Sequence, residues 1–201
     1  MMFGGLQVAT HLKEFLTDRR ILFLLSVLTF YCISTLFSTD FNGVWIAAVI
    51  GIIWFYLVEY IVHRFILHGY FAKWMPKAYK GHDMHHENPN DIEYLLTPNI
   101  YNISYHIGFG ATVFLVTQNF HLACAFMLGI TFYQLYYEWS HFVTHRSIRP
   151  LTPWGRWMKK FHLLHHFKSS NHYFGVTNPS IDMIVGTYPS PVTPAKPNEE
   201  N

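Results

Sequence analysis

The sequence predicts an all-α integral membrane protein, with four transmembrane helices in two hairpins and a helical cap on the cytoplasmic side. Two observations favour this class. Only 13% of the 201 residues are charged, whereas 51% are hydrophobic and 18% are aromatic, and a soluble domain carries about 25% charged residues. Four apolar segments also approach the roughly 20 residues that a helix needs to cross the hydrocarbon core of a bilayer. None of them alternates as a strand would.

The predicted spans are residues 21–37, 44–62, 101–118 and 121–139, and the second is interrupted only by Glu59. A secretory signal peptide is the alternative for the first segment. We favour a true span, because no small-residue cleavage site follows the segment.

The basic residues predict the orientation. All 14 lysines and arginines lie before the first span, between the second and third, or after the fourth. The short connections at 38–42 and around Asn119 contain none. Because basic residues stay on the cytoplasmic side, both termini and residues 63–100 are predicted to face the cytoplasm.

The predicted organisation is a cytoplasmic N-terminal segment, 1–20, followed by a single domain, 21–187. Its cytoplasmic cap combines residues 63–100 and 140–187. The tail, 188–201, holds four prolines and is predicted to be disordered. Within the cap, Thr152 followed by a proline predicts the start of a helix.

The composition excludes other classes of protein. A net charge of +2 without a long basic run outside the membrane flanks gives no support for a nucleic-acid partner. The two cysteines, Cys32 and Cys124, lie in apolar runs and can build neither a disulfide scaffold nor a four-cysteine metal site.

Histidine is the most unusual component, with 14 residues in the chain. Ten of them form four clusters in the order pair, triplet, pair, triplet: His63 and His68; His82, His85 and His86; His141 and His145; His162, His165 and His166. The predicted topology places all four clusters on the cytoplasmic side. This topology follows from the lysines and arginines, so it is independent of the histidines.

Helical geometry predicts how these rings point. Residues three or four apart share one face of a helix, so each triplet is expected to point in one direction, and His141 is expected to stack with His145. His63 and His68 are five apart, or about 140° around a regular helix. We therefore predict a π-helical turn, or a loosened last turn before Gly69, between these two.

Ten neutral imidazoles predict a dinuclear metal site. One zinc ion takes four ligands, whereas two five- or six-coordinate ions use roughly eight to ten. Imidazole suits iron, copper, zinc and nickel alike. A single pair at a helix end would be an ordinary interfacial feature, but four clusters in this order favour metal binding.

Carboxylates near the clusters are expected to support the ligands. Glu59 lies one turn before His63, Glu138 lies three residues before His141, and Asp83 lies inside a triplet. Each could accept the free ring N–H of a metal-bound histidine. His172, which follows the last cluster, is the one candidate for an extra ligand.

These motifs resemble the fatty acid hydroxylase superfamily, which includes fatty acid 2-hydroxylases and sterol-modifying oxidases. The matching stretches are residues 59–68, 81–91, 137–145 and 162–177, and the resemblance extends over about residues 55–190. It is strongest for the fatty acid 2-hydroxylase branch. Two positions depart from the family pattern: Ile181 stands where tryptophan is common, and Glu138 stands where aspartate is common.

The resemblance implies an O2-dependent monooxygenase in which the ten clustered histidines hold two iron ions, with zinc able to occupy the site in purified protein. It implies hydroxylation of a lipid acyl chain, most readily at carbon 2. Eukaryotic members often carry a fused cytochrome b5-like domain, which these residues lack. A separate cytochrome b5-like or ferredoxin-like electron donor is therefore expected. The expected location is a bacterial inner membrane or the endoplasmic reticulum.

Two other functions remain open from the sequence. A sterol desaturase or carotenoid hydroxylase would use the same metal site on another lipid, and lipid mass spectrometry would separate these substrates. A membrane haem protein or metal carrier would be no enzyme. Haem needs only one or two axial histidines, far fewer than the ten in the clusters. A Soret band in the purified protein would indicate bound haem.

Overall fold

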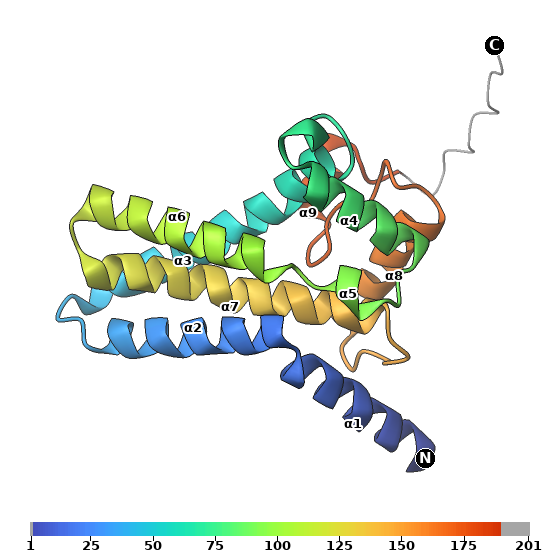
Figure 1. The fold of residues 1–201 in the computed structure, drawn as a ribbon, viewed down its shortest axis with the longest axis horizontal. Coiled ribbons are helices and arrows are strands. Elements are labelled where there is room, and N and C mark those ends of the chain that lie inside the picture. Colours follow the sequence, from blue (N-terminus) through green and yellow to red (C-terminus); the bar gives the residue numbers. More distant parts are fainter. Residues whose placement is uncertain (1, 190–201) are drawn as a thin grey trace.

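The structure is a computed structural model that describes residues 2–189, with side chains from residue 7 onward. Within that range every regular element of secondary structure is a helix. Four long helices lie along one another and smaller helices cover one end of them (Figure 1). The long helices are α2 (Arg19–Leu36), α3 (Phe41–Ile61), α6 (Asn99–Thr117) and α7 (Phe120–Thr144). Each of the four predicted helices is therefore present.

The two hairpins turn at the end of the bundle away from the cap, and side-chain caps start both returning helices. Asp40 accepts a hydrogen bond from the Gly43 N–H at 3.0 Å at the start of α3. Asn119 accepts from the N–H groups of His121 and Leu122 at 3.0 and 3.1 Å at the start of α7. Such caps satisfy backbone donors that a helix start leaves unpaired.

Two glycines let α3 and α7 touch through their backbones. A Cβ atom on Gly129 would lie 1.9 Å from the Ala48 carbonyl oxygen, and one on Gly51 would lie 2.1 Å from the Phe126 carbonyl oxygen. Small residues of this kind allow close helix packing in membranes. This crossing fixes the placement of the cap ends of α3 and α7.

The cap is built from short helices that extend or follow the long ones. They are η1 (Val62–Leu67), η2 (Ala72–Trp74), α4 (Pro76–Glu87), α5 (Ile92–Leu95), α8 (Pro153–Phe167) and α9 (Ser180–Val185). Thr152 caps α8 by accepting from the Gly155 N–H at 3.0 Å, with Pro153 in the first turn, as predicted.

Helix α1 (Met2–Thr17) was not expected from the sequence. It lies at the cap end of the bundle (Figure 1), where Phe15 packs on Trp139 and Phe142 with ring centroids 5.1 and 5.2 Å apart. Glu14 pairs with Arg146 at 2.6 Å. Tertiary contacts with α7, rather than a strong pattern of its own, account for this helix.

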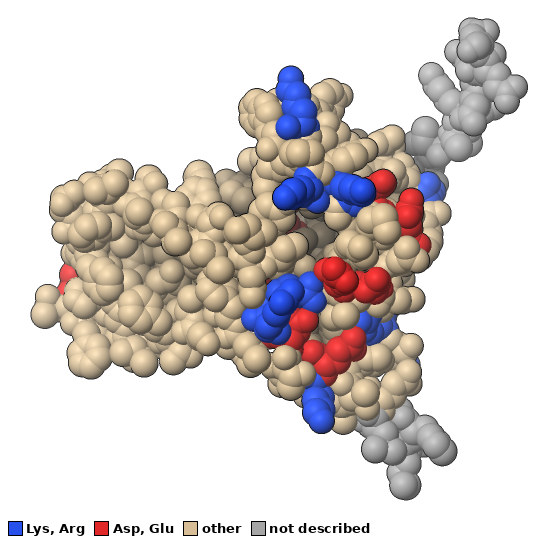
Figure 2. Space-filling model, viewed as in Figure 1, with Lys and Arg blue, Asp and Glu red and all other residues tan. Residues whose placement is uncertain are grey.

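Among the described residues, two helices are long and apolar enough to cross a membrane: Arg19–Leu36 and the continuous segment Phe41–Leu67. On the face in Figure 2, charged side chains gather over the cap end, and the bundle is nearly uncharged. The outward side chains of the bundle include Phe30, Ile50 and Leu115. A large exposed apolar surface indicates contact with lipid. Crossing by α6 and α7, the cytoplasmic orientation and the division at residue 21 stay predictions, and residues 190–201 of the predicted tail lie outside the described residues.

Candidate metal centre

The ten clustered histidines meet at the cap end of the bundle in two groups. Within each group, one ring nitrogen of every member lies within 4.8 Å of those of all the others. Group A consists of His63, His68, His82, His86 and His165. Group B consists of His85, His141, His145, His162 and His166.

The two groups are assembled by the same rule. Group A takes the pair at the end of α3, the first and last histidines of α4 and the middle histidine of α8. Group B takes the pair at the end of α7, the first and last histidines of α8 and the middle histidine of α4. The rings of each triplet lie together as expected, with centroids 4.8–6.1 Å apart in α4, but their nitrogens divide between the two groups. Positions i+3 and i+4 lie on opposite sides of position i, by about 60° and 40°, so each triplet divides between the groups.

The predicted irregularity between His63 and His68 is confirmed. Residues Val62–Leu67 form a π-helical turn, η1, that continues α3. The two rings lie with their centroids 5.0 Å apart. The wider turn brings residues five apart to one side of the helix, which a regular α-helix cannot do.

The nitrogen geometry of group A fits a cation. The Nε2 atom of His82 lies 3.2 Å from that of His63, 2.9 Å from that of His68 and 3.2 Å from that of His86. The Nε2 atom of His165 lies 2.9 Å from that of His68. A neutral ring carries only one hydrogen, so hydrogen bonds cannot satisfy this convergence. Two ligand nitrogens at right angles, each about 2.1 Å from a metal, lie about 3.0 Å apart.

Group B fits a cation through unpaired nitrogens. The Nε2 atoms of His85 and His145 are buried without a hydrogen-bond partner among the described residues. Buried polar atoms normally have partners. The Nε2 atoms of His162 and His166 lie 3.1 Å apart, close to the spacing in group A.

Burial keeps these imidazoles neutral. It is the main cause that lowers the pKa of His145 and of His165 to about 2 and that of His68 to about 3, and neighbouring imidazoles lower them further. The same cause lowers the pKa of His82, His85, His162 and His166. Because the neutral ring is the form that binds metals, both groups are ready to act as ligands near pH 7.

The structure corrects the partners expected for Glu59 and Glu138. Both carboxylates are buried, but neither accepts a ring N–H. Glu59 accepts hydrogen bonds from backbone and side chain of the 172–177 segment, and Glu138 accepts from the Thr97 N–H at 3.3 and 3.4 Å. Asp83 is exposed, and its charge only opposes the lowering of the His86 pKa.

Main-chain carbonyls replace the expected carboxylates. The Nδ1 atom of His63 lies 2.5 Å from the Phe174 carbonyl oxygen, and that of His165 lies 2.8 Å from the His172 carbonyl oxygen. The ring of His172 belongs to neither group and bonds with Ser169 at 2.8 Å. The sequence motif that ends at Thr177 pointed to this segment without revealing its role.

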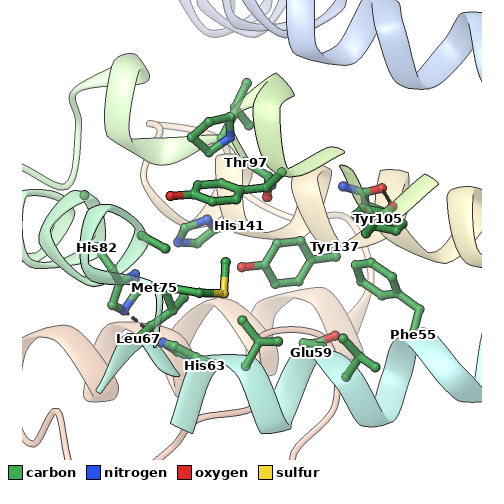
Figure 3. A pocket seen from close by; sticks show the side chains of 18 of the residues that line it. Phe55, Glu59, His63, Leu67, Met75, His82, Thr97, Tyr105, Tyr137 and His141 are labelled. Atoms are coloured by element: carbon green, nitrogen blue, oxygen red, sulfur yellow. Dashed lines mark hydrogen bonds between the residues drawn. The ribbon is translucent and has the colours of Figure 1, made fainter. Parts of the chain in front are cut away.

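An apolar cavity of about 540 Å³ reaches both groups. Its walls come from α3, α4, α5, α6 and α7, and His63, His82 and His141 face into it (Figure 3). Trp54 and Phe109 close its side toward the bundle, with ring centroids 5.6 Å apart. The size lies within the range of about 300–1,000 Å³ typical of small-molecule sites.

Comparison with known proteins gives consistent matches. The profile of the family described as "Fatty acid hydroxylase" matches residues 48–187. The chain is 33% identical over 152 residues to the ceramide very long chain fatty acid hydroxylase SCS7 of Saccharomyces cerevisiae, covering 72% of this chain and 38% of that protein. It is 29% identical over 150 residues to the dihydroceramide fatty acyl 2-hydroxylase FAH2 of Arabidopsis thaliana, covering 73% of this chain and 62% of that protein.

A solved structure supports the same relationship. The visible hydroxylase domain of full-length scs7p aligns with a TM-score of 0.71 and 29% identity, covering 88% of this chain and 67% of that one. Of the two curated relatives above, the chain spans 38% of the length of the yeast protein and 62% of the length of the Arabidopsis protein.

The fold and the site define a helical, membrane-associated protein with two groups of histidines that could hold metal ions. The family profile matches residues 48–187, which are more than two-thirds of this chain. The chain therefore belongs to the fatty acid hydroxylase family. The resemblance expected from the sequence motifs is confirmed.

Proposed function

We propose that the protein is a di-iron oxygenase that hydroxylates a lipid acyl chain, most readily at carbon 2. The observation that carries this proposal is the apolar cavity whose wall contains His63 and His82 of group A together with His141 of group B. A hydrocarbon chain in this cavity lies beside both groups of ligands. The names of the relatives support the same reaction.

The ten histidines of groups A and B are the proposed metal ligands. Two bound iron ions would supply the oxidising power, drawn from O2, that an unactivated C–H bond requires. The reaction consumes the substrate, O2, two electrons and two protons, and it yields the alcohol and one water. A separate donor, of the cytochrome b5 or ferredoxin type, supplies the electrons.

The walls of the cavity bind the chain and exclude water. Apolar side chains, including Trp54, Phe109 and Ile130, line its end within the bundle, and Lys77 and Glu93 line it beside the cap. Because carbon 2 adjoins the carbonyl group, the polar end of the substrate must remain close to the histidines. We infer that this end lies near Lys77 and Glu93, with the chain extending between α3 and α6.

The proposed topology has four membrane-crossing helices, with both termini and the metal centre on the cytoplasmic side of a bacterial inner membrane or the endoplasmic reticulum. The gathering of charge at the cap end supports this orientation. Substrate would reach the cavity from the bilayer, because its apolar end lies among the long helices.

Lipid profiling of cells that express the chain, supplied with isotopically labelled O2, tests the function. We expect one labelled oxygen at carbon 2 of acyl chains and none in cells that express His85→Ala. Altered sterols or carotenoids with unchanged acyl chains would overturn the proposed substrate. A Soret band without any oxygenated lipid would favour the haem alternative.

A further inference from the structure

We propose that segment 172–177, held by the buried carboxylates of Glu59 and Asp182, positions the histidines of group A and makes A the better preorganised metal site. The inference rests on the proposed metal centre. It goes beyond that centre by assigning positioning roles to two carboxylates that touch no ligand ring.

Glu59 holds the C-terminal half of the segment. Its Oε1 atom accepts hydrogen bonds from the N–H groups of Val176 and Thr177 at 2.7 and 2.9 Å. Its Oε2 atom accepts from the Thr177 hydroxyl at 2.6 Å. Glu59 lies on α3 only one turn before His63, so it fixes the segment to the helix that carries this ligand.

Asp182 holds the other half. It accepts from the N–H groups of Phe174 and Gly175 at 2.9 and 2.8 Å and from the Thr187 hydroxyl at 2.6 Å. The fit is close, because a Cβ atom on Gly175 would lie 2.2 Å from the Asn178 carbonyl oxygen. Charge-assisted hydrogen bonds of this kind are stronger than neutral ones.

The segment so held presents two carbonyl groups to group A. The His172 carbonyl group faces the Nδ1 atom of His165, and the Phe174 carbonyl group faces the Nδ1 atom of His63. A carbonyl oxygen can only accept a hydrogen bond, so the Nδ1 atoms of His63 and His165 carry the ring hydrogen. The Nε2 atom of each ring therefore keeps its lone pair for a metal. Between these carbonyls, Tyr173 has a φ of 62°, in the left-handed region that non-glycine residues rarely adopt. Backbone strain of this kind persists where the surroundings hold it in place.

Group B has less support of this kind among the described residues. The main chain of Leu95 interacts with His141, whereas the Nδ1 atoms of His85, His162 and His166 are buried there without a hydrogen-bond partner. A purely structural role for Glu59 and Asp182 would affect both groups alike. A positioning role would weaken group A alone, and this difference is measurable.

The test is the number of zinc ions that the purified full chain retains during dialysis against increasing chelator, measured by elemental mass spectrometry. Wild type should retain two. Glu59→Gln and Asp182→Asn should each release one ion at a roughly 10- to 100-fold lower chelator concentration, the usual effect of altering an outer partner of a ligand, and keep the other. His172→Ala is the matched control and should behave as wild type, since the carbonyl group remains.

Double variants identify the ion that leaves. Glu59→Gln combined with His165→Ala should retain one ion, whereas Glu59→Gln combined with His85→Ala should retain none. Thr177→Val removes one of the three hydrogen bonds to Glu59 and gives a milder second variant, for which we expect a smaller loss of the same ion. Retention of both ions as in wild type, or equal weakening of both, would overturn the inference. If wild type bound no metal, the proposed function itself would fail.

Discussion

Groups A and B are built from the same set of ligands but are supported differently. Each combines a pair at or just beyond the end of a long helix, two histidines four apart on a cap helix and one histidine from the opposite cap helix. In group A, two rings are oriented by carbonyl groups of a segment that buried carboxylates hold. In group B, the main chain of Leu95 interacts with His141, and three Nδ1 atoms have no partner among the described residues. Equal ligand sets therefore need not give equal sites.

Different contacts support group B from outside. Arg146, which follows His145 directly, bonds to Glu14 of α1 and to the Asn90 carbonyl group. Its guanidinium also lies 4.8 Å from the centre of the Phe142 ring. Group A is thus supported at two ring nitrogens, whereas these contacts support group B through the side chain of Arg146, just beyond the helix that carries His141.

The largest expected effect comes from removing one ligand of either group. His165→Ala in group A and His85→Ala in group B should each lower hydroxylation by more than the roughly 10- to 100-fold typical of outer partners, because the proposed reaction needs both ions. Product formation per folded protein is the measurement. Substantial activity in one variant only would show that a single group suffices.

The crossing of α3 and α7 sets the relative position of the two groups. Gly129→Ala would place a Cβ atom 1.9 Å from the Ala48 carbonyl oxygen and should destabilise the fold by about 1–3 kcal/mol. Gly110→Ala is the control, since its Cβ would meet only Met127 at 3.7 Å. Thermal unfolding compares the two, and equal melting temperatures would argue against backbone contact at the crossing.

Metal removal from the wild type should separate the groups. We expect the ion of group B to leave first, with retention differing by about tenfold, because fewer of its rings have an orienting main-chain acceptor. A time course of metal loss under chelation should then show two phases. A single phase for both ions would mean that the carbonyl groups add nothing to retention.

The smallest effect is expected at the ion pair between Glu14 and Arg146. The hydrogen bond from Arg146 lowers the pKa of Glu14 below its ordinary value of 4.5. The pair therefore stabilises the fold above about pH 4.5, and this contribution is lost as the pH falls through the lowered pKa. Because the Glu14 side chain is 34% exposed, Glu14→Gln should cost at most about 1 kcal/mol at pH 7. The difference in unfolding free energy from wild type should shrink in acid, and a growing difference would contradict the assignment.

Much of the architecture could be predicted from local patterns. Apolar length located the four long helices, and the five-residue spacing of His63 and His68 required the π-helical turn that the structure contains. Helix α1 was not predicted because it is stabilised by contacts of Phe15 with α7 and of Glu14 with Arg146, and such tertiary contacts leave no local signal in the sequence.

The site was predictable in membership but not in arrangement. The four clusters identified the ten histidines that meet. Their division into two groups depends on the approach of α4 and α8, which spacing alone does not give. The hydrogen-bond partners of Glu59, Val176 and Thr177, lie 117 and 118 residues away along the chain. No local sequence pattern could therefore reveal them.

The most direct test of the central claim is the metal content of the full chain purified without oxygen. We expect two iron ions per chain, because group A and group B each present five converging histidines. A chain that is folded and binds at most one ion under these conditions would contradict it.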